Sequence, residues 1–282
     1  MSRFTVVLAS LCLSVSSTAA LAQQASSSAY AVGANENVSA AGAVTATVNV
    51  GPLAPSSGAA PPSYNNSNSV ASVSQNAALT TGLQSVTQGL QTGILTSNAN
   101  GTSTAAQSTA TVNNLQLSFS DAQILTTLLG LSATTIQSTS QANSIGGLDA
   151  SGSTTIEGLT LFGLLLGGTT INGSLFVNPA PNTVLLSIDG LSIILNEQTM
   201  LGDGVTSTGI STNAIDIVMN NFPLGTSLAN GNIIIGHSQA LASLGQPAAV
   251  PEPATWAMML LGFCGVGAAM RRRRKAPLMQ LA

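Results

Sequence analysis

The chain has 282 residues, only 5% of them charged, and a formal net charge of −3. All six cationic side chains lie near the two ends, so residues 23–250 contain neither lysine nor arginine. A surface without cations cannot neutralise phosphates, which excludes nucleic acid and makes anionic polymers poor partners, while neutral glycans, mineral cations and other exported proteins stay open.

The N-terminal segment predicts export. Arg3 supplies a cation, an apolar stretch follows over residues 4–13, and Ala20 and Ala22 flank Leu21 in a small-x-small cleavage site. This order is typical of a secretory signal peptide over residues 1–22, with the mature chain beginning at or near Gln23. A membrane-spanning helix is disfavoured because the apolar stretch is short and serines follow it.

Residues 23–78 lack a clear packing pattern and predict a flexible, low-complexity leader. A strand is expected near residues 40–50, which are rich in valine and threonine. Four prolines and a run of serine and asparagine over residues 51–68 indicate a loop or linker. Residues 79–94 show apolar positions at helical spacing, but their glycines and threonines favour strand after Gly89.

The body, residues 79–244, is predicted to be all-β. Leu115, Leu117 and Phe119 alternate with polar residues, as in a strand with one buried face. Asn172-Gly173 and Asp189-Gly190 have the residue types that tight hairpins favour. Ten or so short strands with regularly placed turns predict an antiparallel β-sandwich or a barrel-like fold.

The C-terminal segment has three parts in a fixed order, after a linker at 245–250. Pro251, Glu252 and Pro253 come first, and their prolines predict an extended backbone. An uncharged stretch at 254–270, with Trp256 near its start, predicts a single transmembrane helix. A basic cluster follows and is expected to fix the orientation of the helix in the membrane; it consists of Arg271, Arg272, Arg273, Arg274 and Lys275. A short tail at 276–282 ends the segment.

This tail, from Val250 to Lys275, resembles the PEP-CTERM sorting domain in its PEP-x-x-W-A form. The resemblance implies that a membrane-embedded exosortase recognises and removes the tail, in a Gram-negative bacterium that makes exopolysaccharide. It also implies export through the inner membrane, transient anchoring there, and a final place on the cell surface or in the medium. Exopolysaccharide and other matrix proteins are then candidate partners, and the alternative is an ordinary C-terminal anchor.

The body is similar to exported choice-of-anchor domains, most of all to the type labelled P. The similarity covers residues 79–244 and is carried by four segments, at 154–163, 195–198, 212–217 and 232–238. Such domains occur joined to different surface-anchoring tails. The resemblance therefore implies an extracellular module and implies no activity.

The body contains candidate residues for two kinds of catalytic site. His237 is the only histidine, so it would have to be the base of any Ser-His-Asp triad, but no Gly-x-Ser-x-Gly elbow is present. Glu157 and Glu197 are candidates for the paired carboxylates of a glycosidase. The scarcity of aromatic residues in the body argues against such a sugar site.

No cofactor or metal is expected. Both cysteines, Cys12 and Cys264, lie in the terminal signals, so the body has no thiolate ligand, disulfide or cysteine nucleophile. Asp189-Gly190 and Asp203-Gly204 offer oxygens to calcium but are read as turn residues. The sequence thus predicts an exported, non-catalytic surface module, with a hydrolase acting on surface polysaccharide as the alternative; a β-solenoid adhesin lacks the repeat it would need.

Overall fold

The computed structural model describes residues 23–40, 43–81, 84–121, 126–224, 227–245 and 253–273. The chain divides into two compact units. One, Ala22–Gly245, is the β body. The other joins Met1–Leu21 to Gln246–Ala282 and contains helix α1 (Pro253–Arg273).

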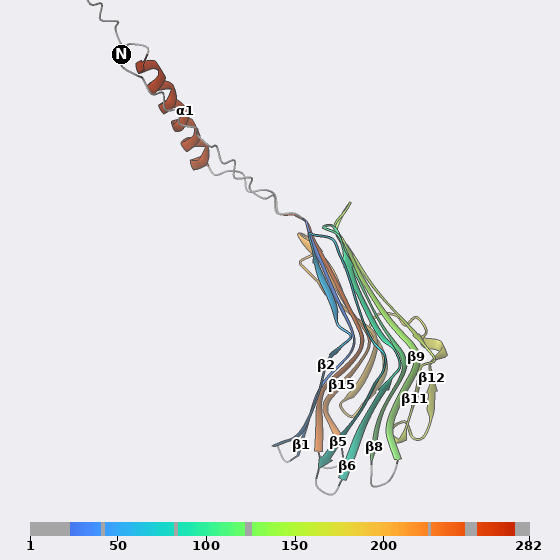
Figure 1. The fold of residues 1–282 in the computed structure, drawn as a ribbon. Coiled ribbons are helices and arrows are strands. Elements are labelled where there is room, and N and C mark those ends of the chain that lie inside the picture. Colours follow the sequence, from blue (N-terminus) through green and yellow to red (C-terminus); the bar gives the residue numbers. More distant parts are fainter. Residues whose placement is uncertain are drawn as a thin grey trace, which may run out of the picture. The chain divides into compact units, whose positions relative to one another are not determined.

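The body consists of two antiparallel sheets that pack face to face (Figure 1). Sheet A has the order β13-β14-β15-β16-β1-β2, with β3 beside β1; its strands are β1 (Gln24–Ala40), β2 (Ala43–Leu53), β3 (Ser56–Ala60), β13 (Thr183–Ile188), β14 (Leu191–Leu201), β15 (Ser207–Leu224) and β16 (Ser227–Ser243). Both ends of this order are open. The sandwich prediction is confirmed, whereas the barrel-like alternative is wrong.

Sheet B has the order β12-β11-β9-β8-β6-β5, with β10 beside β9 and the pair β4-β7 beside β8. Its strands are β4 (Tyr64–Val70), β5 (Val73–Thr81), β6 (Gln84–Thr92), β7 (Leu95–Gly101), β8 (Ala105–Asp121), β9 (Thr126–Asn143), β10 (Asp149–Glu157), β11 (Thr160–Phe162) and β12 (Thr170–Asn172). Two 3₁₀ turns, η1 (Leu164–Leu166) and η2 (Gly173–Phe176), flank β12.

The strands are longer than the turn spacing predicts: β9 and β15 each have 18 residues. The Asp189-Gly190 hairpin is confirmed, because it joins β13 to β14 and both residues have positive φ, 42° and 83°. The Asn172-Gly173 hairpin is wrong. Asn172 has an extended φ of −96° and Gly173 begins η2.

The predicted flexible leader at 23–78 is wrong. Its first part is β1, which pairs with β16 on one side and with β2 and β3 on the other, inside sheet A. The body accordingly begins near residue 22 rather than at 79. The inner face of β1 carries small side chains such as Ala25, Ser27 and Ala29, which are buried yet give little hydropathy contrast with their serine neighbours. The strand expected near 40–50 is present as β2.

The interior has two zones. One is a large aliphatic core with residues such as Leu115, Ile136 and Ile215. The other is built from small side chains, including Ala106, Ala142 and Ala240. Hydroxyl groups join the two sheets in this second zone: Ser108 Oγ donates to the carbonyl of Gln239 at 2.8 Å and accepts from its N–H at 2.9 Å.

A row of interrupted strand pairs crosses sheet A between the two zones. The row consists of four residues that form no ladder pairs: Ala31, Gly236, Ala214 and Asn196. The pairs directly before and after these residues keep the same register. Gly236 and Asn196 have positive φ, 69° and 52°. Two consecutive residues are therefore buried at this row, as Ala214 and Ile215 are, and the inward–outward alternation is reset. The long strands bend about halfway along their length (Figure 1).

Candidate functional site

The structure describes only part of the C-terminal sorting segment. Pro253, Trp256 and Arg271 to Arg273 lie in α1, which begins at Pro253 rather than after an extended Pro-Glu-Pro. Proline is tolerated at a first helical position because its missing N–H would have no partner there. The other segment residues that sequence reasoning selected lie outside the described residues: Ala20, Ala22, Pro251, Glu252, Arg274 and Lys275. Gln23 is the first residue described, directly before β1.

Helix α1 exposes apolar side chains, among them Leu260, Leu261 and Phe263. Among the described residues, no helix combines the length and apolarity needed to cross a membrane. The transmembrane role of residues 254–270 stays a prediction.

His237 lies in a polar row on the outer face of sheet A. The strand register places Tyr30, His237, Asn213 and Glu197 side by side on β1, β16, β15 and β14. The rings of Tyr30 and His237 stack, with centroids 4.5 Å apart. His237 Nδ1 lies 2.7 Å from Asn213 Oδ1, and Asn213 Nδ2 donates to Glu197 Oε2 at 2.7 Å. Because the amide NH₂ of Asn213 donates to Glu197, its oxygen is the acceptor and His237 carries a proton on Nδ1.

Burial determines the charge state of this row. It lowers the pKa of His237 to about 4, so the imidazole is neutral at pH 7. Asp216, one row further along β15, is 5% exposed. Burial, with the neighbouring carboxyl of Glu197 as the second cause, raises the pKa of Asp216 to about 7. Burial and the Asp216 charge raise the pKa of Tyr30 to about 12.

The two candidate glycosidase carboxylates, Glu157 and Glu197, do not lie together. Glu197 interacts with Asn213 and Asp216 in sheet A, while Glu157 is exposed at the end of β10 in sheet B. The triad idea gains no support either, since the partner of His237 Nδ1 is an asparagine rather than a carboxylate.

The two Asp-Gly loops are turns. Asp203 Oδ1 accepts hydrogen bonds from the backbone N–H groups of Val205, Thr206 and Ser207, and Oδ2 accepts from the Thr206 hydroxyl. These bonds hold the pKa of Asp203 below its usual range. The described parts of the chain contain no group of three or more His, Cys, Asp or Glu side chains placed to hold a metal ion.

A second site, which sequence reasoning missed, covers the outer face of sheet B. Neutral polar side chains form three rows across β4, β7, β8, β9 and β10, and we call these rows the polar face. The first row is Asn65, Asn100, Gln107, Gln141 and Ser151. The second is Ser67, Asn98, Thr109, Thr139 and Ser153. The third is Ser69, Thr96, Thr111, Gln137 and Thr155. Every one of these side chains is exposed or half-buried, while most of the alternate residues on β7, β8, β9 and β10 are buried.

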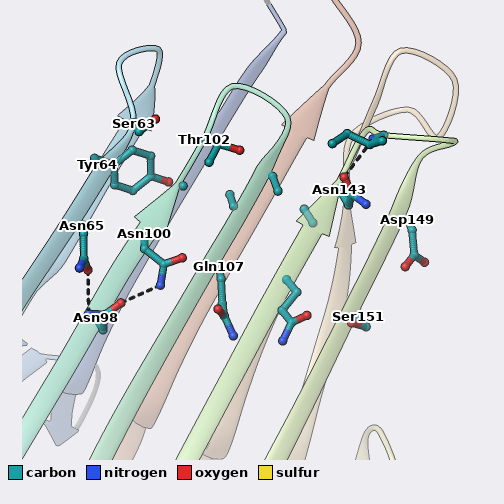
Figure 2. Close-up of a pocket in the computed structure, with 16 residues that line it drawn as sticks. Ser63, Tyr64, Asn65, Asn98, Asn100, Thr102, Gln107, Asn143, Asp149 and Ser151 are labelled. Carbon is teal, nitrogen blue, oxygen red and sulfur yellow. Dashed lines mark hydrogen bonds between the residues drawn. The ribbon is translucent and has the colours of Figure 1, made fainter.

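The first row lies in a hollow of about 850 Å³. Figure 2 shows labelled side chains of this row on neighbouring strands, with Asn98 of the second row bonded to both Asn65 and Asn100. Asn98 Nδ2 donates to Asn65 Oδ1 at 3.2 Å, and Asn100 Nδ2 donates to Asn98 Oδ1 at 2.9 Å. A second hollow of about 430 Å³ lies over the parts of the other two rows that belong to β4, β7 and β8. The signal that could have revealed this face is the run of Ser, Thr, Asn and Gln within its strands, as at residues 65–69 and 137–141.

The C-terminal segment is where the chain resembles proteins already known. The family model of the PEP-CTERM protein-sorting motif matches residues 249–274, which include Pro251, Trp256 and the arginines. No curated protein matches the chain. The matched motif indicates a surface protein that is targeted by an exosortase, exported, and sorted to the cell surface.

Proposed function

We propose that the chain is an exported, non-catalytic β module whose tail is read and removed by an exosortase in the inner membrane of a Gram-negative bacterium. The observation that carries the proposal is the match at residues 249–274, with its fixed order of Pro-Glu-Pro, apolar segment and cations. The body is then left on the cell surface or in the extracellular matrix. Residues 254–270 hold the precursor in the membrane until cleavage.

The structure of the body supports a binding module more than a hydrolase. Glu157 and Glu197 lie in different sheets, and among the described residues Asp149 is the only acidic one that lines the larger hollow. Three of the four segments similar to choice-of-anchor P domains, at 195–198, 212–217 and 232–238, lie on the neighbouring strands β14, β15 and β16. The kinship of the body with that extracellular family is part of this proposal.

The test is a triple substitution of Pro251, Glu252 and Pro253 by alanine in the full chain, expressed in cells with a working exosortase. A plain anchor tolerates the change, because none of these residues needs to enter the hydrocarbon. A processing enzyme does not, so uncleaved membrane-bound precursor should accumulate. The matched control replaces Gln246 and Pro247, just before the matched segment, and should be processed normally.

Mass measurement of the extracellular form decides the result. Wild-type product should begin at or near Gln23 and lack the cluster from Arg271 to Lys275. A wild-type product that still ends at Ala282, or a triple variant processed like the control, would reduce the tail to an ordinary anchor.

A further inference from the structure

The polar face has a composition that selects its ligand. Its three rows contain amide and hydroxyl side chains and no charge. Within the described part of the chain, the only ionisable groups that line the larger hollow are Asp149 and the Tyr64 hydroxyl. A polyanion finds no cation here, because residues 23–250 contain none. A polycation finds a single carboxylate. Both hollows are also open and are lined mostly by polar residues, unlike the mostly apolar clefts that enclose small ligands.

The hydrogen-bonding capacity of the face matches a polyol. Asn, Gln, Ser and Thr each offer donors and acceptors, as a sugar hydroxyl group does. Adjacent strands lie about 4.8 Å apart, so one row presents these groups regularly over about 19 Å. The amides of Asn65, Asn98 and Asn100 are already bonded to one another, which reduces the ordering that a ligand would have to impose.

We propose that the polar face binds an extended, neutral polysaccharide chain. The inference deepens the proposed function and rests on it, since the face meets extracellular polysaccharide only if the body is exported. Each hydrogen bond replaces one made with water, so a single sugar binds weakly. A polymer that occupies several rows at once gains from multivalency. Stacking contributes little, because Tyr64 is the only aromatic residue among the described ones that line the larger hollow, and its hydroxyl is bonded to Ser27.

The experiment is affinity electrophoresis of the purified full-length chain, kept in a neutral detergent, through native gels. Separate gels contain hydroxyethylcellulose, galactomannan or alginate. We expect retardation by at least one of the two neutral polymers and none by the anionic alginate. No retardation in either neutral gel, or equal retardation in all three, overturns the inference.

The variant replaces Asn100, Gln107 and Gln141 by alanine and should raise the apparent dissociation constant about tenfold or more. The matched control removes three polar side chains from one row on the outer face of sheet A: Thr199, Ser211 and Gln239. It should bind like wild type. If the first variant unfolds, Gln107→Ala alone carries the test, with a several-fold loss expected. Equal binding by polar-face and control variants overturns the assignment.

Failure of the polysaccharide inference and failure of the proposed function give different experimental results. A chain that is processed correctly in cells but is not retarded overturns this inference alone. A chain that is retarded but keeps its tail overturns the exosortase proposal alone.

Discussion

The substitution Glu36→Gln should make the body more stable, and only at high pH. Glu36 is 1% exposed, points between the sheets and accepts a hydrogen bond from Gln88 Nε2 at 3.1 Å. Burial raises its pKa from 4.5 to about 7, and the bond from Gln88 opposes this only in part. The folded state therefore keeps a proton that the unfolded state releases between these two pH values. Stability is lost as the pH rises through that window.

The size of the effect follows from the two pKa values. A rise from 4.5 to about 7 corresponds to about 3 kcal/mol of lost stability once the pH exceeds both. Glutamine is neutral at every pH, and its NH₂ can donate to Gln88 Oε1, which is buried and has no partner among the described residues. Glu36→Gln should thus match wild type at pH 5 to within about 1 kcal/mol and exceed it by about 3 kcal/mol at pH 8.

Urea unfolding at pH 5 and pH 8, followed by far-UV circular dichroism, measures the difference. Fluorescence is unsuitable because the only tryptophan, Trp256, lies in the tail. Glu157→Gln is the matched control, since it removes an exposed carboxylate from sheet B and should not reproduce the gain at pH 8. A gap between Glu36→Gln and wild type that stays constant with pH, or a variant less stable at pH 8, would refute the reasoning.

Two further predictions concern single side chains. NMR of the imidazole of His237, the only histidine, should show a neutral ring at pH 5.5, and titration of the ring near pH 6.5 would contradict the burial argument. The contribution of His237 to stability should fall as the pH drops from 6.5 towards 4, because the unfolded chain takes up the proton first. Ser108→Ala should cost about 1–3 kcal/mol in urea unfolding, because the N–H and carbonyl of Gln239 lose their partner across the sandwich. The exposed Ser151→Ala is its control, and equal small losses in both variants would show that the bonds between the sheets contribute little.

The sequence predicts the fold class because its signals are local. The alternation of Leu115, Leu117 and Phe119 appears as buried positions in β8, and Asp189-Gly190 closes a hairpin as expected. The strand β1 could not be recognised, because the small-residue zone buries alanine and serine rather than large aliphatic side chains. Period-two patterns then carry almost no hydropathy contrast.

The candidate sites escaped prediction for a different reason. The row around His237 joins β1 to β16, so Tyr30 stacks on a residue more than two hundred positions away. Only the strand order of sheet A reveals this neighbour. The polar face likewise depends on the register of five strands, and no single strand shows that its serines and asparagines continue across a sheet.

The absence of cations also explains the acid chemistry of the body. A buried carboxylate is usually stabilised by an arginine or lysine, but between residues 23 and 250 there is none. Glu36 and Asp216 are nevertheless buried, in opposite faces of sheet A, and burial raises the pKa of both to about 7. A bound proton takes the place of the missing cation. The same composition leaves the polar face uncharged. It also makes the folded body more stable below pH 7 than above it, because the effects of Glu36 and Asp216 together outweigh the opposite effect of His237.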